Sequence, residues 1–274
     1  MTTTAGVGLD AVVPIGGGDI CRAMRARTTG GRAVFAKTLA PAPADFFGAE
    51  ARGLAMLRVD GGPPVPEVVA VGADGLVLEW VEPGRPSASA AHELGRALAV
   101  MHAASPMRFG ADADGFIGRL GLDNSPAGTW PEFFVERRLA PYLGALSTDE
   151  RASVERLCDR IHDVCGPAER PALIHGDLWS GNVLWAADGS AWLVDAASAH
   201  GGHRETDLAM LALFGAPHLD EVLRGYDDVA PLADGWRARV PLHQLHPLLV
   251  HATMFGGGYG AQAARAAEAA LRAG

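Results

Sequence analysis

Three oxygen-bearing side chains stand out because their spacing predicts that they meet at one point. Asp177 and Asn182 belong to the block HGDLWSGN at residues 175–182, and Asp195 follows an apolar run at residues 192–194. The intervening sequence has Asp-Gly at 188–189, a pair typical of a two-residue hairpin turn. Because a hairpin joins the ends of its strands, we expect Asn182 and Asp195 to lie side by side. Oxygen ligands placed together suit a hard cation such as Mg²⁺.

Asp177 lies on the same loop, but the hairpin does not draw it into that ligand set, so its carboxylate is left to accept a proton. A His-x-Asp loop with Asn five positions after the Asp, followed by a metal-binding aspartate, is typical of phosphoryl transfer enzymes. In these enzymes a base takes the proton of the incoming hydroxyl and a cation offsets the phosphate charge. The alternative is a polar loop, because these residue types are common in turns. The joint spacing favours the catalytic interpretation.

Lys37 is the only lysine; the other 22 lysine or arginine positions are arginines. A position that keeps an ammonium fits a need for a compact point charge. In the strand predicted at 32–39, period two places Lys37 on an apolar face, and Glu50 lies on the apolar stripe of a helix predicted over 46–57. Because a lone buried ion is costly, we predict a Lys37–Glu50 ion pair, with Lys37 also reaching nucleotide phosphates. The alternative is two solvated charges on element edges.

A glycine turn precedes this strand. Gly16, Gly17 and Gly18 lie between candidate strands at 12–15 and 20–27. Backbone N–H groups of such a turn can approach phosphate oxygens closely. We interpret the turn as a phosphate-binding loop, with a plain flexible hairpin as the alternative.

The secondary structure predicted around these residues changes at the segment EPGRP, residues 82–86, whose proline and glycine residues interrupt regular structure. Before it, the pattern predicts strands, the last at 76–81, and the one helix at 46–57. After it, the pattern is mainly helical, with helices expected at 92–102 and 147–164 and the hairpin at 183–194. We therefore predict two domains, 1–83 and 84–274.

The composition excludes several classes of protein for this chain. The chain has 274 residues, of which 49% are hydrophobic and 20% charged, as expected of a globular protein. Its net charge of -9 argues against nucleic acid or an anionic membrane as the main partner. No apolar run is long enough for a membrane helix, and the three cysteines form no disulfide framework. We expect a cytoplasmic protein.

With these residues in place, the sequence resembles the fructosamine kinases, in the aminoglycoside/choline kinase branch of the protein-kinase-like fold. HGDLWSGN reads as that family's signature, and its Trp-Ser-Gly insertion is the specific part. The blocks GHRETDLAM at 202–210 and FGGGY at 255–259 also resemble family motifs. The likeness runs over nearly the whole chain and departs at 119–122, where RLGL stands in place of the expected Thr-Pro-Gln.

The resemblance implies an α+β, two-lobed protein-kinase-like fold: a small antiparallel β-sheet lobe with one helix and a larger, mainly helical lobe. Residues 1–83 would be the N-terminal ATP-binding lobe, and residues 84–274 the C-terminal catalytic and substrate lobe. ATP would bind between the lobes, with its adenine against the backbone of Glu79, Trp80 and Val81.

The resemblance also implies roles for the residues found above. Asp177 would be the general base, Asn182 and Asp195 would hold Mg²⁺, and Lys37, oriented by Glu50, would bind phosphate. The implied reaction is ATP-dependent phosphorylation of the sugar 3-hydroxyl of a ketosamine, free or protein-linked, whose unstable product releases the amine. Two alternatives stay open: a kinase for another small hydroxylated amine such as an aminoglycoside, and a nucleotide-binding protein without turnover.

Four further residues have two interpretations each. Trp179, beside the base, stacks on a sugar face or packs the catalytic loop. Arg204 and Glu205 contact the substrate or pair with each other. Asp207 caps a helix or braces the catalytic loop, and for this residue we favour a structural role.

Overall fold

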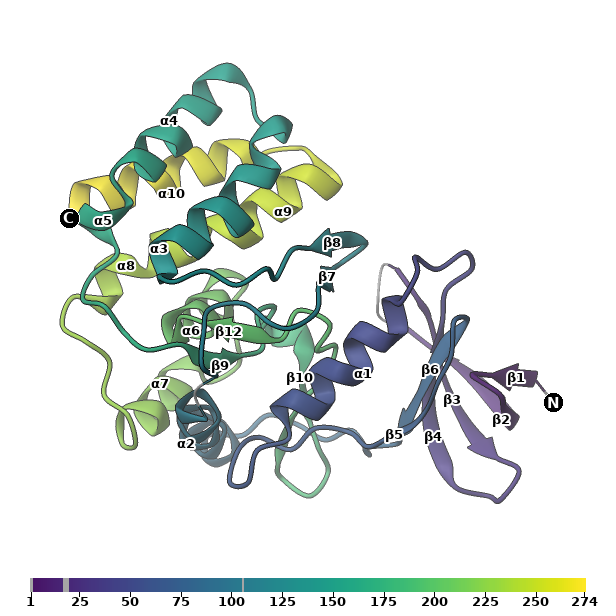
Figure 1. Cartoon of the computed structure of the whole chain (residues 1–274). Helices are drawn as coiled ribbons and strands as arrows, with labels where there is room; N and C mark the ends of the chain where they lie inside the picture. Colours follow the sequence, from purple (N-terminus) through teal and green to yellow (C-terminus); the bar gives the residue numbers. More distant parts are fainter. Residues whose placement is uncertain (1, 17–19, 105) are drawn as a thin grey trace.

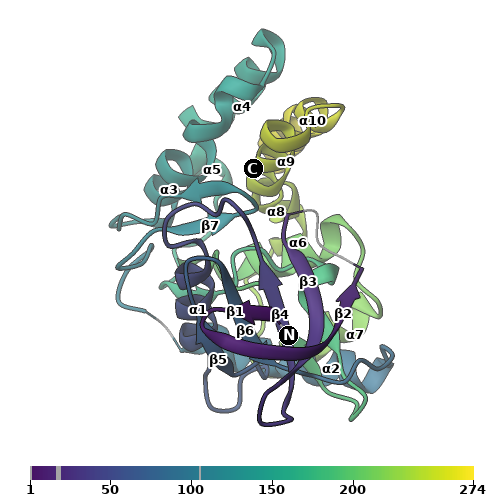
Figure 2. The ribbon, with the colours of Figure 1, turned by 90° about the vertical axis from the view of Figure 1, so that its right-hand side faces the viewer.

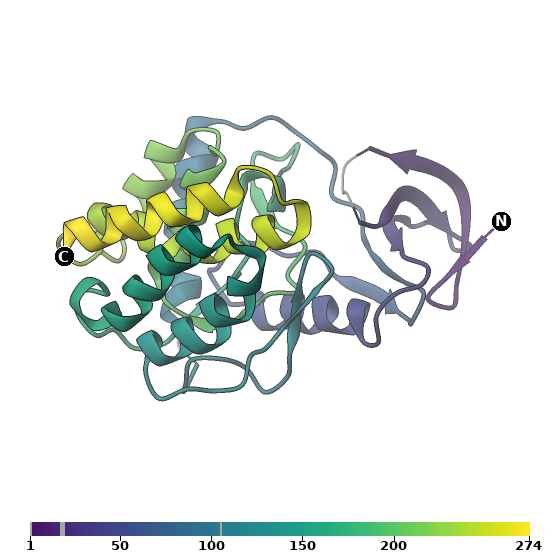
Figure 3. The ribbon, with the colours of Figure 1, turned by 90° about the horizontal axis from the view of Figure 1, so that it is seen from above.

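The computed structural model describes residues 2–16, 20–104 and 106–274. A β-sheet lies at one end of the molecule and a helical body at the other, with the N-terminus on the sheet side and the C-terminus at the far end of the helices (Figure 1, Figure 3). The two-lobed α+β fold expected from the sequence is confirmed. Gly17 and Gly18, two of the predicted phosphate-binding glycines, lie outside the described residues.

The small lobe is a six-stranded antiparallel sheet in the order β1-β2-β3-β4-β6-β5. The sheet is strongly curved (Figure 2), and β2 carries a register shift between Asp10 and Val13. Its only helix among the described residues, α1 (Phe46–Leu57), has the predicted bounds and lies between the sheet and the large lobe (Figure 1). The strands are β1 (Thr2–Thr4), β2 (Val7–Ile15), β3 (Arg22–Thr28), β4 (Ala33–Thr38), β5 (Val68–Val71) and β6 (Gly75–Glu79).

The large lobe is mainly helical, with short two-stranded sheets between the helices. Its first part contains α2 (Ala88–Ala103), β7 (Gly115–Ile117), β8 (Leu120–Leu122), α3 (Trp130–Phe133), the π-helix η1 (Phe134–Leu139), the 3₁₀ helix η2 (Ala140–Ala145), α4 (Thr148–Asp159) and α5 (Ile161–Val164). Its second part contains β9 (Ala172–Ile174), the 3₁₀ helix η3 (Ser180–Asn182), β10 (Val183–Trp185), β11 (Ala191–Leu193), β12 (His200–Gly202), α6 (Arg204–Leu213), α7 (Leu219–Asp227), α8 (Trp236–His243), α9 (Leu245–Phe255) and α10 (Tyr259–Ala273).

The single helix predicted over 147–164 is broken in the structure. Its start is as predicted, since Ser147 and Glu150 form a capping box. The backbone then leaves the helical conformation at Arg160, with φ -115° and ψ 19°, and this residue separates α4 from α5. The apolar stripe continues through Ile161 and Val164, which are both buried, so side-chain periodicity alone did not reveal the break.

One hydrophobic core joins the two lobes. Leu54 and Leu76 of the small lobe belong to the same buried cluster as Leu98 and Leu193 of the large lobe. The segment between the lobes is also anchored, because the backbone N–H of Gly84 donates to the carbonyl of Trp185 at 2.7 Å. The predicted linker is thus tied to the β10–β11 hairpin. Shared burial and these hydrogen bonds hold the sheet at a defined position over the large lobe.

Candidate active site

Lys37 lies between two carboxylates at the junction of the lobes. Its Nζ is 2.5 Å from Oε2 of Glu50 and also forms an ion pair with Oδ1 of Asp195. β4 supplies the lysine, α1 supplies the glutamate, and Asp195 follows β11. Lys37 and Glu50 are 7% and 3% exposed. The predicted Lys37–Glu50 ion pair is present, and Asp195 is a second partner of the ammonium.

A glycine brings α1 close enough for this contact. A Cβ at Gly53 would stand 1.7 Å from the carbonyl oxygen of Ala196, well inside contact distance. The helix therefore packs its bare backbone directly on the segment that follows Asp195. Glu50 precedes Gly53 by one helical turn, so the same face of α1 carries the carboxylate to Lys37.

The charged groups at this junction shift one another's pKa values. Burial, and the neighbouring charge of Asp195, raise the pKa of Glu50 to about 7 against the opposing effect of Lys37. Burial also disfavours the charged form of Lys37, but its two carboxylate partners outweigh that effect and raise the pKa of the ammonium. The lysine therefore remains a fixed positive charge at neutral pH.

Asn182 and Asp195 are held together by the hairpin, as predicted. β10 and β11 pair in antiparallel register, and the N–H of Val194 donates to the carbonyl of Asn182 at 3.1 Å. The side-chain amide of Asn182 donates to the backbone carbonyl of Asp177 at 2.7 Å and to its Oδ2 at 3.3 Å. Those bonds use Nδ2, and no hydrogen bond to Oδ1 forms within the described part of the chain. An amide oxygen and a carboxylate form an oxygen donor set that fits Mg²⁺.

Asp177, predicted to be the general base, has a carboxyl whose pKa is raised toward neutral pH. Burial raises the pKa of its carboxyl to about 7, and the negative charge of Asp195 adds to that shift. A base works best when its pKa lies near the pH at which it operates. The adjacent His175 is not free to take this role, because its Nε2 bonds to the carbonyl of Val194 at 2.9 Å and burial lowers its pKa.

Asp207 braces the catalytic loop, the structural role favoured from the sequence. Its carboxylate accepts the backbone N–H groups of His175 at 2.8 Å and Gly176 at 3.0 Å. His102, from α2, adds a contact of 3.2 Å and itself bonds to the hydroxyl of Tyr226 at 2.9 Å. Sequence reasoning missed His102 and Tyr226. The only available signal was the position of His102 at the end of an apolar helical stripe.

A cavity of about 390 Å³ opens at this junction. Residues with proposed chemical roles line it together: Lys37, Glu50, Asp177, Trp179, Asn182 and Asp195. Trp179 is 40% exposed there, and its ring lies 6.2 Å from that of Phe214. The structure thus gathers Lys37, Glu50 and the residues predicted to act as base and cation ligands around one space.

Several predicted nucleotide contacts do not line this cavity. Gly16 follows β2 outside it, and the other two glycines of that turn are not described. Glu79 ends β6, and Trp80 and Val81 lead toward α2. Trp80 contacts the Arg25 guanidinium, which lies 4.6 Å from its ring centre. The adenine role of residues 79–81 remains a prediction.

The two predicted substrate contacts on α6 lie elsewhere. Arg204 forms hydrogen bonds of 2.7 and 2.8 Å to the carboxylate of Glu169. Glu205 pairs with Arg239 at 3.0 and 2.5 Å. Neither residue lines the cavity, and they do not pair with each other. The substrate role of Arg204 and Glu205 therefore stays a prediction, and in this structure both side chains pair with other charged groups of the large lobe.

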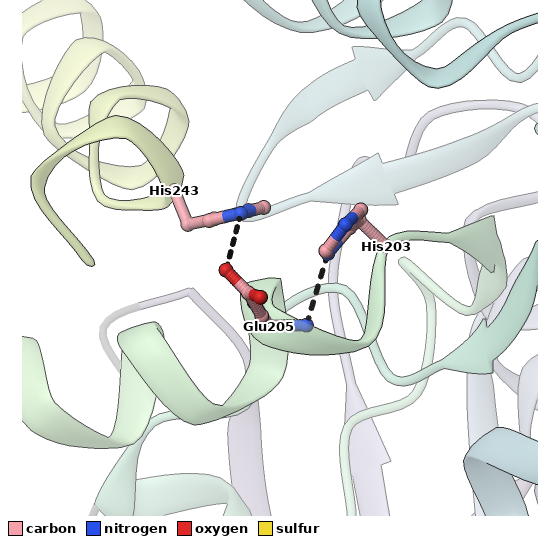
Figure 4. Close-up of side chains that lie close together, drawn as sticks. All are labelled: His203, Glu205 and His243. Atoms are coloured by element: carbon pink, nitrogen blue, oxygen red, sulfur yellow. Dashed lines mark hydrogen bonds and ion pairs between the residues drawn. The ribbon is translucent and has the colours of Figure 1, made fainter. Parts of the chain in front are cut away.

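Glu205 also lies beside two buried histidines, His203 and His243 (Figure 4). One potential ligand atom from each of the three residues lies within 4.8 Å of the others, a spacing compatible with a metal ion. However, both oxygens of Glu205 accept hydrogen bonds from Arg239, and Nδ1 of His203 faces the Glu205 backbone N–H at 3.3 Å. Arg239 thus already engages both carboxylate oxygens, and its positive charge opposes a cation beside Glu205. We interpret this group as a buried ion-pair network.

Comparison with known proteins identifies relatives over most of the chain. The chain matches the family model described as fructosamine kinase over residues 2–273. It is 38% identical over 257 residues to a probable ketoamine kinase of Thermus thermophilus, covering 92% of each chain. It is 35% identical over 260 residues to a probable ketoamine kinase of Enterococcus faecium, again covering 92% of each.

Solved structures agree with this result. The crystal structure of a provisionally assigned fructosamine-3-kinase from Thermobifida fusca superimposes with a TM-score of 0.91 at 48% identity, covering 98% of this chain and 96% of the other. The aminoglycoside phosphotransferase APH(4)-Ia shares the fold, with a TM-score of 0.67 at 18% identity over 97% and 95% of the two chains. Within the described residues, no helix is both long and apolar enough to span a bilayer.

Proposed function

The chain belongs to the fructosamine kinase family, and we propose that it transfers the γ-phosphoryl group of ATP to the 3-hydroxyl of a ketosamine. In this proposal residues 1–83 bind ATP and residues 84–274 bind the acceptor. The phosphorylated product is unstable and releases the amine, so the net effect is removal of a sugar from an amine. The acceptor is a ketosamine, either free or linked to a protein.

The observation that carries the proposal is the position of Lys37. A single ammonium at the wall of a cavity contacts Glu50 and Asp195, while Asp177 lines the same cavity. Phosphoryl transfer needs positive charge on the phosphate side and a base on the acceptor side. The described residues provide both within one space.

The proposed step assigns one task to each group. Asp177 accepts the proton of the acceptor hydroxyl while the hydroxyl oxygen forms a bond to the γ-phosphorus and the bond to the ADP oxygen breaks. Asn182 orients Asp177 through its amide and keeps Oδ1 for the cation. Mg²⁺, held by Asn182 and Asp195, would offset the charge of the phosphates. Lys37 adds a positive charge that Glu50 holds in place.

The test is turnover of ATP with fructosyl amines as acceptors, compared with an aminoglycoside as an alternative acceptor. We expect ADP formation that depends on the ketosamine. Asp177→Asn keeps the shape of the side chain but removes the base, so kcat should fall by about 10²–10⁴-fold while ATP still binds. Asp60→Asn is the matched control, because Asp60 is exposed and lies outside the cavity.

Different outcomes reject different parts of the proposal. Phosphorylation of the aminoglycoside alone would reject the ketosamine assignment and keep the kinase chemistry. ATP binding without turnover on any acceptor would reject catalysis. Near-normal turnover by Asp177→Asn would show that another group takes the proton.

A further inference from the structure

Beyond the catalytic groups, the cavity continues along a wall that is almost entirely apolar. The wall is built by the end of α6, by α9 and by β7, and its residues are Phe116, Met210, Phe214, Val250, Met254 and Phe255. Among the described residues that line the cavity, the only carboxylates are Glu50, Asp177 and Asp195, and the proposed mechanism uses all three. The far part of the cavity therefore offers apolar surface without free negative charge.

Large aromatic side chains lie next to one another in this region. The ring of Phe214 is 6.2 Å from Trp179 and 5.0 Å from His251, and His251 is 5.5 Å from Phe255. Trp179, Phe214 and Phe255 are 40%, 39% and 54% exposed. Exposed aromatic groups gathered at a cavity are typical of a ligand-binding surface. We call Trp179, Phe214, His251 and Phe255 the aromatic wall.

His251 provides the polar group of this wall. Its Nδ1 lies 2.7 Å from the carbonyl of Pro247, and a carbonyl only accepts, so Nδ1 carries a hydrogen. In the neutral ring Nε2 is then an acceptor. Because Nδ1 faces the helix backbone one turn earlier, the opposite edge of the ring, with Nε2, points away from α9. No hydrogen bond to Nε2 forms within the described part of the chain.

We propose that the aromatic wall binds the amine substituent of the acceptor and selects ketosamines whose substituent is apolar and carries no second positive charge. This inference rests on the proposed function and names the substrate class within it. Every ketosamine has one amine beside the sugar, for which Nε2 of His251 is an acceptor. A second ammonium would lose its hydration against Phe214 and Phe255 without gaining a carboxylate.

The experiment compares three acceptors that share the fructosyl group and differ in the amine: methylamine, hexylamine and 1,6-diaminohexane linked at one end. Each is assayed at saturating ATP. We expect kcat/KM for the hexylamine derivative to exceed that for the diaminohexane derivative by about tenfold, the effect of roughly 1.4 kcal/mol of differential binding. The methylamine derivative should lie below the hexylamine derivative, because it buries less apolar surface.

Matched variants test the location of the preference. Phe255→Glu adds a carboxylate to the aromatic wall, whereas Phe255→Gln removes the ring without adding charge. We expect kcat/KM for the diaminohexane derivative to be at least about threefold higher in Phe255→Glu than in Phe255→Gln, because only the former supplies a counter-charge. Val71→Glu adds the same charge at an exposed position on β5, outside the cavity, and should leave the ratio of the two acceptors unchanged.

The outcomes separate this inference from the proposed function. Equal kcat/KM values for the hexylamine and diaminohexane derivatives, or a preference for the latter, would overturn the inference while leaving the kinase assignment in place. The same change in Phe255→Gln as in Phe255→Glu would also overturn it. Failure to phosphorylate any of the three acceptors would reject the proposed function itself. If Phe255→Glu does not fold, the ratio measured on the unmodified protein decides.

Discussion

At the scale of single residues, the site depends on one ammonium shared by two acids. Glu50 is buried and has a pKa raised to about 7, whereas Asp195 is half-exposed and has a lowered pKa because Lys37 outweighs the effect of desolvation. The two carboxylates therefore differ in task. Glu50 fixes the lysine inside the protein, and Asp195 stays ionised toward the cavity, where a cation would bind.

Glu50→Gln tests this division. The substitution keeps the shape of the side chain and removes its charge, so the ammonium is held by Asp195 alone and competes with the cation for it. We expect kcat/KM for ATP to fall by about tenfold or more. Because Lys37 retains one partner, the free energy of unfolding should change by less than about 2 kcal/mol.

Steady-state kinetics and urea unfolding provide the two measurements. Glu155→Gln is the control, since Glu155 forms an exposed ion pair with Arg151 and does not line the cavity. Unchanged ATP kinetics in Glu50→Gln would show that Glu50 does not orient the lysine.

At the scale of elements, local patterns predicted most of what positions the site. Helix α1 has the predicted bounds, and period two correctly placed Lys37 on the face that meets it. The Asp-Gly turn predicted the hairpin that brings Asn182 to Asp195. These features depend on neighbours within a few residues, and such neighbours are visible in a sequence.

The features that were missed depend on distant parts of the chain. The edge strands β1 and β5 are only 3 and 4 residues long, too short for a clear alternating pattern. His102 and Asp207 are separated by 105 positions, and no periodicity connects them. The partners of Arg204 and Glu205 are also distant along the chain, at 35 and 34 positions, so the motif did not reveal these ion pairs.

Gly53→Ala tests whether close approach of α1 builds the site. The added methyl would overlap the carbonyl of Ala196, so the helix must move away and carry Glu50 with it. We expect a loss of about 1–3 kcal/mol in the free energy of unfolding and a fall in kcat/KM of about tenfold or more in the folded protein.

Gly144→Ala is the matched control, because that glycine also lies in a helix but its Cβ would meet nothing within 4 Å. Chemical denaturation and ATP kinetics on both variants measure the effect. Full activity and stability in Gly53→Ala would contradict the packing described for α1.

At the scale of the whole molecule, the large lobe contains a buried charge network outside the cavity. Glu205 is 3% exposed and accepts hydrogen bonds from Arg239. Burial opposes ionisation of Glu205, but hydrogen bonds from His243 and Arg239 outweigh it and lower its pKa to about 2. The network therefore stabilises the fold when Glu205 is ionised.

The sign of the pH dependence follows from this lowered pKa. The stabilisation is present above the unfolded-state pKa of Glu and is lost as the pH falls toward the folded-state value. Glu205→Gln leaves the Arg239 charge buried without its partner and should lower the free energy of unfolding by about 3 kcal/mol at pH 7. Between pH 6 and pH 4 that free energy should fall less steeply in the variant, by about 1 kcal/mol.

Urea unfolding at several pH values measures both effects. Because Glu205 does not line the cavity, the KM for the ketosamine should stay within about twofold of the unmodified protein. A large rise in KM with unchanged stability would instead show that Glu205 contributes to substrate binding.

The most direct test of the account is the identity of the phosphorylated product. The protein would be incubated with ATP, Mg²⁺ and the fructosyl derivative of hexylamine, and the mixture followed by phosphorus and proton NMR. The account predicts one new phosphate ester, coupled to the proton on carbon 3 of the sugar, with one ADP formed for each ester. An ester on another carbon, or ADP released with inorganic phosphate and no ester at any time, would contradict it.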